Sequence, residues 1–121
     1  MFNFLSMEIY LFAKSTLLGK VNSRIVDDSM GVSGGLLEPS TAYYENSQSF
    51  FRSHTAKADW RKLTQIELKA ALETGEVLQC ESGICVDDAE GFNEVDVSFC
   101  GLNQRIMDMF RKQEEGESRA T

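Results

Sequence analysis

The chain has 121 residues, of which 42% are apolar and 26% are charged, with one Pro, nine Gly and three Cys. A chain of this length can bury roughly two-thirds of the surface that it exposes when unfolded, so we expect one folded domain without a disulfide scaffold. The apolar fraction excludes a disordered chain, and no uncharged apolar stretch reaches the roughly 18 residues of a membrane span. The net charge of −7 argues against a nucleic-acid-binding protein, because neutralising phosphates takes clustered Lys and Arg.

The negative charge is concentrated in one segment. Residues 1–70 have a net charge of +1 and residues 101–121 a net charge of 0, whereas residues 71–100 contain eight acids and no Lys or Arg. Basic side chains gather instead around Trp60, where Asp59 is the only acid among them: Arg52, His54, Lys57, Arg61 and Lys62. The sequence therefore predicts a polarised protein with one acidic surface.

The amino terminus and the cysteines indicate a reducing compartment. Residues 1–6 are apolar but have neither the basic residues nor the small-residue cleavage site of a secretory signal, and Met7 is a second candidate start. Cys80, Cys85 and Cys100 are odd in number, so they cannot all pair within one chain. We therefore expect free thiols and a cytoplasmic protein.

The first third of the chain predicts two strands and a loop. Residues 8–14 are short, β-branched and aromatic, which is typical of a buried strand. Residues 21–26 predict a second strand, joined to the first by a hairpin connection at 17–20. Residues 27–35 contain three Gly and two Ser, which favours a mobile loop.

A helix is expected after Pro39, because the fixed φ angle of proline suits a first helical turn. Tyr43, Ser47, Phe50 and Phe51 then recur at helical spacing. We interpret this aromatic stripe as core packing.

Two interpretations fit residues 64–75. A capping box at the start and a glycine at the end favour a helix. Alternation of apolar with mostly charged residues over 67–73, followed by a two-residue turn at 74–75, favours a strand and a hairpin. We favour the hairpin, because the period of two continues into residues 76–80.

The last third of the chain predicts two strands and a helix. Residues 83–87 and 94–100 predict strands joined by an acidic turn, and in the second strand Val95, Val97 and Phe99 alternate with polar residues. Residues 103–113 predict an amphipathic helix, and residues 114–121 have no apolar anchor.

These elements together predict an α+β fold. We expect a single domain over residues 1–113, with a mostly antiparallel sheet of five or six strands and two helices packed on one face. Residues 114–121 are expected to form a flexible tail.

No pattern in the sequence points to catalysis, a cofactor or a metal. The glycines of residues 31–35 lack the Lys-Ser/Thr pair of a phosphate-binding loop, and Glu38 would place an acid where a phosphate should lie. His54 is the only histidine, and the cysteines lie in or beside apolar strands, where a buried thiol is inert. The spacing from Cys80 to Cys85 also exceeds that of zinc sites.

The acidic residues carry the functional prediction. Acids on neighbouring strands repel one another, so a surface of one sign is expected to serve a purpose, and cationic partners are attracted to such a surface. We predict that five acids supply the electrostatics and that Phe92, or alternatively Trp60, supplies a hydrophobic anchor. The five acids are Asp87, Asp88, Glu90, Glu94 and Asp96.

This surface predicts a small acidic, non-catalytic binding protein that docks and neutralises a basic partner, such as a toxin or a nuclease. Immunity proteins and antitoxins work in this way, and the comparison is one of class. No contact with nucleic acid or membrane is expected. Two alternatives are a regulatory or structural homo-oligomer, such as a homodimer, and a small hydrolase that uses His54 and nearby carboxylates.

Overall fold

The computed structural model describes the backbone of residues 7–120 and the side chains of residues 7–113. The strands are β1 (Met7–Ala13), β2 (Thr16–Asp27), β3 (Val32–Pro39), β4 (Leu68–Leu72), β5 (Val77–Leu78), β6 (Gly83–Asp87) and β7 (Asp96–Cys100). The helical segments are the π-helix η1 (Tyr43–Ser47) and the α-helices α1 (Gln48–Ala56), α2 (Trp60–Ile66) and α3 (Gln104–Ala120).

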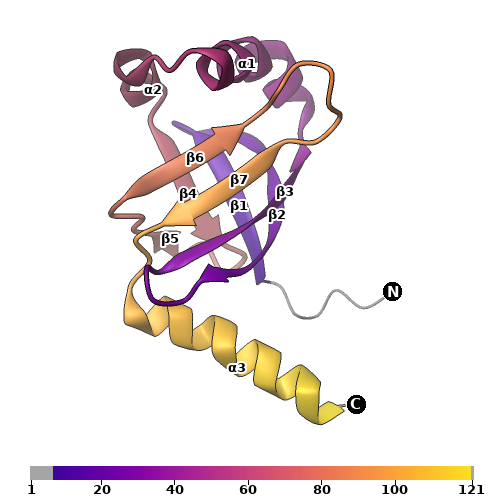
Figure 1. The fold of residues 1–121 in the computed structure, drawn as a ribbon, viewed down its shortest axis with the longest axis vertical. Helices are drawn as coiled ribbons and strands as arrows, with labels where there is room; N and C mark the ends of the chain where they lie inside the picture. The colour runs from indigo at the N-terminus through magenta and orange to yellow at the C-terminus, as the bar shows by residue number, and fades with distance from the viewer. Residues whose placement is uncertain (1–6, 121) are drawn as a thin grey trace.

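The strands form one antiparallel sheet in the order β5-β4-β1-β2-β3-β7-β6. Figure 1 shows this sheet curled on itself, so that β6 and β7 lie across the core from β1 and β4. The two end strands, β5 and β6, are not paired with each other among the described residues. The fold is therefore a half-barrel with an open seam.

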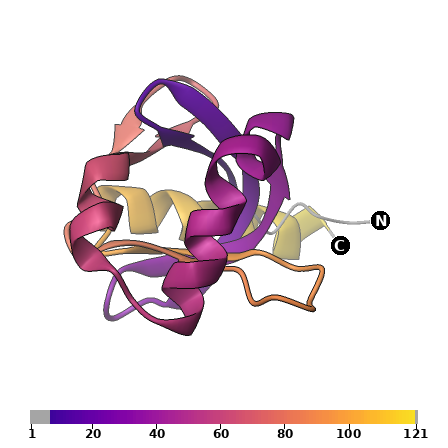
Figure 2. The ribbon, with the colours of Figure 1, turned by 90° about the horizontal axis from the view of Figure 1, so that it is seen from above.

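Helices close the two ends of the curled sheet. Helices α1 and α2 lie together at one end, which Figure 2 shows from above, and α3 lies at the opposite end. The α+β class is confirmed, with more strands and helices than expected and with the helices at both ends. A curled sheet leaves its apolar interior open at each end, so amphipathic helices bury most surface there. Among the described residues, none of the helices combines the length and the apolar composition of a membrane span.

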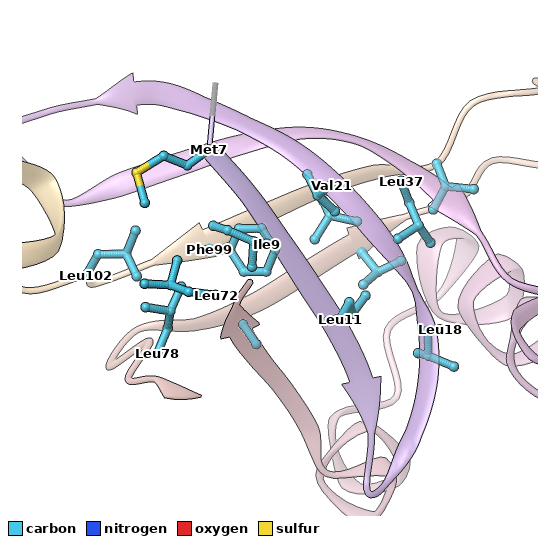
Figure 3. Packing of buried hydrophobic residues seen from close by; sticks show 14 of the residues in the cluster. Met7, Ile9, Leu11, Leu18, Val21, Leu37, Leu72, Leu78, Phe99 and Leu102 are labelled. Carbon is cyan, nitrogen blue, oxygen red and sulfur yellow. The ribbon is translucent and has the colours of Figure 1, made fainter. Parts of the chain in front are cut away.

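The core fills the inside of the curl, as Figure 3 shows. Alternate residues of β1 point inward, so Met7, Ile9 and Leu11 are buried and meet Phe99 from β7. The buried face of α3 closes the lower end of this core and consists of Ile106, Met107 and Phe110.

Two expectations for the first third of the chain are wrong. Residues 17–20 lie inside β2 and not in a turn, and of the loop expected over residues 27–35 only residues 28–31 form a turn, whereas residues 32–35 begin β3. The glycines of β3 allow the backbones of β2 and β7 to lie close to it. A Cβ on Gly35 would lie 2.3 Å from the Asn22 carbonyl oxygen, and one on Gly34 would lie 2.8 Å from the Val97 carbonyl oxygen. Gly31 is the turn residue, with a φ angle of +68°.

The hairpin interpretation is confirmed by β4 and β5, although residues 73–75 form the connection in place of the expected two-residue turn. The sequence interpretation missed α2, which includes residues 64–66. Asp59 caps this helix by accepting a hydrogen bond from the Lys62 N–H at 3.1 Å. Thr64 lies in the last turn of α2 and not at a helix start. At the other end of the chain, α3 extends beyond the expected end at residue 113, while Thr121 of the expected tail lies outside the described residues.

Candidate functional site

Five of the six residues expected at a partner-binding site share one end of the β6–β7 hairpin and are exposed. Asp87 ends β6, Asp96 begins β7, and the loop between them holds Glu90, Phe92 and Glu94. Figure 2 shows this loop projecting beyond the body of the sheet, beside η1 and α1. The hairpin therefore brings the expected acidic residues together.

Asp88 is the exception, because its side chain is only 1% exposed. Its carboxylate accepts hydrogen bonds from the Tyr43 hydroxyl at 2.6 Å and the Gln48 amide at 3.3 Å, and it pairs with Arg52 Nε at 3.2 Å. Its backbone N–H donates to the Thr55 hydroxyl at 3.0 Å. The expectation that Asp88 faces a partner is wrong: strand alternation turns it inward, where it holds the hairpin against η1 and α1.

Tyr43 is fully buried at the centre of this network, whereas the Arg52 side chain is 33% exposed. Burial, and then the hydrogen bond to Asp88, raise the pKa of Tyr43 far above its usual value of 10.0. The phenol therefore stays protonated and keeps donating its hydrogen bond to the carboxylate. The network fixes the loop against η1 and α1.

Asp87 and Asp96 are directly opposite each other in the β6–β7 ladder. Both side chains are exposed on the outer face of the half-barrel. Within the described part of the chain, neither forms an ion pair or a side-chain hydrogen bond. Like charges in this arrangement destabilise a sheet, so the fold retains an unfavourable pair at its surface.

A hollow of about 280 Å³ lies beside this pair, between β6–β7 and the α1–α2 region. Asp87, Asp96, Cys85, His54 and Trp60 all contribute to its lining. The indole of Trp60 is 66% exposed, an unusual position for so large an apolar group. Carboxylates and an aromatic face in one hollow suit a cationic group.

The imidazole of His54 is held in place by its neighbours. Its Nδ1 accepts a hydrogen bond from the Asp59 N–H at 2.8 Å, so a neutral ring carries its proton on Nε2. The ring stacks on Phe50 at 5.3 Å and meets Trp60 edge-on at 4.9 Å between centroids. His54 thus orients Trp60, and no hydrogen bond joins it to Cys85 among the described residues.

Phe92 belongs to a second hollow, of about 330 Å³, on the other side of the loop. The hollow is lined by Phe92, Tyr44, Pro39 and the edge of Arg52, among others. Phe92 is 68% exposed and Tyr44 is 56% exposed. Phe92 therefore does not fold inward as a plug, and two aromatic side chains are accessible beside the acidic loop.

The three cysteines approach one another near the start of β6 and are free thiols. Burial, followed by the nearby Cys100, raises the pKa of Cys80 to about 11, and burial and the nearby Cys85 raise the pKa of Cys100. Cys85 is exposed, contrary to the expectation that all three thiols are buried. Among the described residues, no group of three or more His, Cys, Asp or Glu side chains is placed to hold a metal ion.

Sequence reasoning found the acids and Phe92 but missed that Cys85, Ser98 and His54 share the hollow with Trp60. The position of Cys85 between Ile84 and Val86 in β6 could have indicated that it points outward, although the sequence analysis expected it to be buried. Nothing local placed α2 beside it. Comparisons with protein-family models, with curated proteins and with solved structures gave no match.

Proposed function

We propose that this chain is a non-catalytic binding protein whose acidic face docks a basic partner protein and neutralises it, the partner being a toxin or a nuclease. The acidic face consists of Asp87, Glu90, Glu94 and Asp96, with Trp60 and Phe92 at its two sides. The observation that carries the proposal is the Asp87–Asp96 pair, whose two carboxylates lie opposite each other in the ladder. Within the described residues no cationic side chain pairs with them, and the exposed indole of Trp60 lies beside them.

The physical reason is that a basic partner would convert an unfavourable pair into a favourable contact. A surface of one sign raises association rates by roughly 10- to 1000-fold and selects against partners of the same sign. The exposed aromatics add apolar area that can become buried at the centre of an interface. The buried Asp88–Arg52 network supports this role by holding the loop in one conformation before binding.

The test is a charge reversal that leaves Asp88 untouched. The wild-type protein captures the partner from a lysate of the source organism, and association is then measured with Asp87→Lys/Glu94→Lys at several salt concentrations. We expect association at low salt to slow by at least about tenfold and its salt dependence to flatten.

The matched control is Glu73→Lys/Glu81→Lys, which changes the net charge equally at exposed positions outside the acidic face. This variant should associate much more nearly like the wild type. Equal slowing in both variants would mean that only net charge matters, and no slowing in either would contradict the docking proposal.

A further inference from the structure

The outer edge of β6 has no neighbouring strand. β6 is the last strand in the sheet order and pairs only with β7. In an antiparallel edge strand, every second residue directs its N–H and C=O away from the ladder. Across the described residues, no backbone group pairs with residues 84–87 on that side. The edge is therefore unpaired over residues 84–87, and just beyond it the Asp88 N–H donates to the Thr55 hydroxyl of α1.

Two hollows follow this edge and meet at shared residues. The first is lined by residues 84–87 in succession, and their side chains alternate between the two faces, so the hollow must run along the strand edge. The second, of about 370 Å³, lies in the seam between β6 and the β4–β5 pair. Leu63 of α2 and Ile84 line both hollows. The two hollows therefore adjoin beside the unpaired edge, and we refer to them together as the groove.

The groove differs in charge along its length. One end holds Asp87, Asp96 and the exposed Trp60, whereas the other holds Lys69, whose ammonium lies 5.4 Å from the centre of the Phe12 ring. On neighbouring α2, Arg61 and Lys62 do not line the hollow, and the Lys62 ammonium lies over the Phe50 ring at 5.6 Å. The acidic end can therefore hold a cation between carboxylates and an indole.

We propose that the free edge of β6 takes up an extended segment of the basic partner as an added strand, with one Lys or Arg side chain of that segment between Trp60 and the Asp87–Asp96 pair. This proposal rests on the proposed function and specifies how the partner is held. Main-chain hydrogen bonds supply affinity, and the acidic hollow selects the side chain.

A second copy of the chain is a poorer occupant of the same edge. β6 carries Asp87 and no basic residue, so pairing two β6 strands would bring further acids against the opposed pair. An extended cationic segment removes that repulsion, and charge complementarity therefore selects it.

The probe is a short synthetic peptide of alternating Thr and Arg, and the reporter is the fluorescence of Trp60, the only tryptophan in the chain. To block the edge without changing charge, Cys80→Ser/Cys100→Ser leaves Cys85 as the single thiol, which N-ethylmaleimide then alkylates. The same variant before alkylation is the reference. We expect alkylation to weaken peptide binding at least about tenfold and to abolish the fluorescence change.

The matched control carries the same adduct outside the groove. Ser29→Cys, in the exposed β2–β3 turn, lines neither hollow; it is combined with Ser at positions 80, 85 and 100 and is alkylated in the same way. This adduct should leave peptide affinity and the Trp60 response unchanged. A second pair separates position from charge: Asp87→Asn/Asp96→Asn should weaken binding strongly, and Glu73→Gln/Glu81→Gln only slightly.

The outcomes separate this inference from the proposed function. If the peptide binds in a salt-dependent way but neither the Cys85 adduct nor Asp87→Asn/Asp96→Asn alters affinity or fluorescence, the β6 edge is not the site and the acidic face can still dock a partner elsewhere. If the peptide does not bind even at low salt, the docking proposal itself fails. If the wild type forms a dimer that the Cys85 adduct dissociates, the occupant is a second copy and the inference is overturned.

Discussion

Asp88 and Asp87 are adjacent, identical in chemistry and opposite in role. Asp87 is exposed beside the hollow, whereas Asp88 is buried and satisfied by Tyr43, Gln48 and Arg52. A buried carboxylate is stable only when it is paired and hydrogen-bonded, and this one has both kinds of partner. The network therefore secures the loop that presents the exposed acids.

Removing this carboxylate is expected to destabilise the fold. Asp88→Ala leaves the Tyr43 hydroxyl and the Arg52 guanidinium without their acceptor, and we expect a loss of about 2–4 kcal/mol in the free energy of unfolding. This loss of stability is at the lower end of the range for breaking a buried ion pair, because the Arg52 side chain is 33% exposed. Urea unfolding measures it, with Asp87→Ala as the neighbouring control, and equal losses in the two variants would contradict the role assigned to Asp88.

Tyr43 makes stability depend on alkaline pH. Its pKa in the folded state lies above the unfolded value of 10.0, mainly because of burial, so its contribution is fully present below pH 10 and is lost as the pH rises toward the folded value. We expect the urea midpoint to fall as the pH rises above about 10, and to fall less in Tyr43→Phe. If the urea midpoint fell equally with pH in the wild type and in Tyr43→Phe, Tyr43 would not be the group responsible.

At the scale of elements, β3 shows why a glycine-rich segment can be a strand. β3 is paired on both sides, with β2 and with β7, and a side chain at Gly35 would meet the β2 backbone. Glycine here permits close approach, which local composition alone cannot distinguish from a loop.

Gly35→Ala is therefore expected to cost about 1–3 kcal/mol in unfolding free energy, because the Cβ contact at 2.3 Å is with backbone and cannot be relieved by a rotamer change. Thermal and urea unfolding measure the effect. Leu36→Ala, at the half-exposed neighbouring position, should cost less. If Gly35→Ala left the free energy of unfolding unchanged, β2 and β3 would have to lie further apart than in this structure.

The opposed Asp87–Asp96 pair in the β6–β7 ladder is expected to lower stability while favouring partner binding. Asp87→Asn removes the repulsion across to Asp96 and should raise the free energy of unfolding by up to about 1 kcal/mol at low salt, while weakening partner binding. Added salt should shrink the gain in stability. A variant that is less stable than the wild type would contradict an unfavourable pair.

At the scale of the whole molecule, the exposed acids and bases are grouped on different elements. The acidic face lies on the β6–β7 hairpin, and exposed bases lie on and before α2: Lys57, Arg61 and Lys62. This separation also suits the alternative proposal of a homo-oligomer, in which the bases of one copy pair with the acids of another.

Sedimentation at low and high salt separates the two proposals. For a protein that docks a different, basic partner, we expect a monomer at both salt concentrations. Self-association through charge would appear at low salt and weaken at high salt. A dimer of that kind would favour the homo-oligomer over the docking protein.

The sequence by itself determined the features that depend on neighbouring residues. β-Branched and aromatic composition located β1, alternation located β7, the period of two favoured the hairpin of β4 and β5, and counting charges placed the acids on one segment. These patterns persist because side-chain direction in a strand is fixed by the local backbone.

Only the tertiary structure decided the burial of Asp88, the strand state of β3 and the groove along β6. Asp88 meets Tyr43, which precedes it by 45 positions, and Gly35 meets Asn22 of another strand. The groove depends on a curled sheet that leaves its end strands apart and on α2 lying beside them. Contacts between distant segments set these features, and no local pattern encodes which segments will meet.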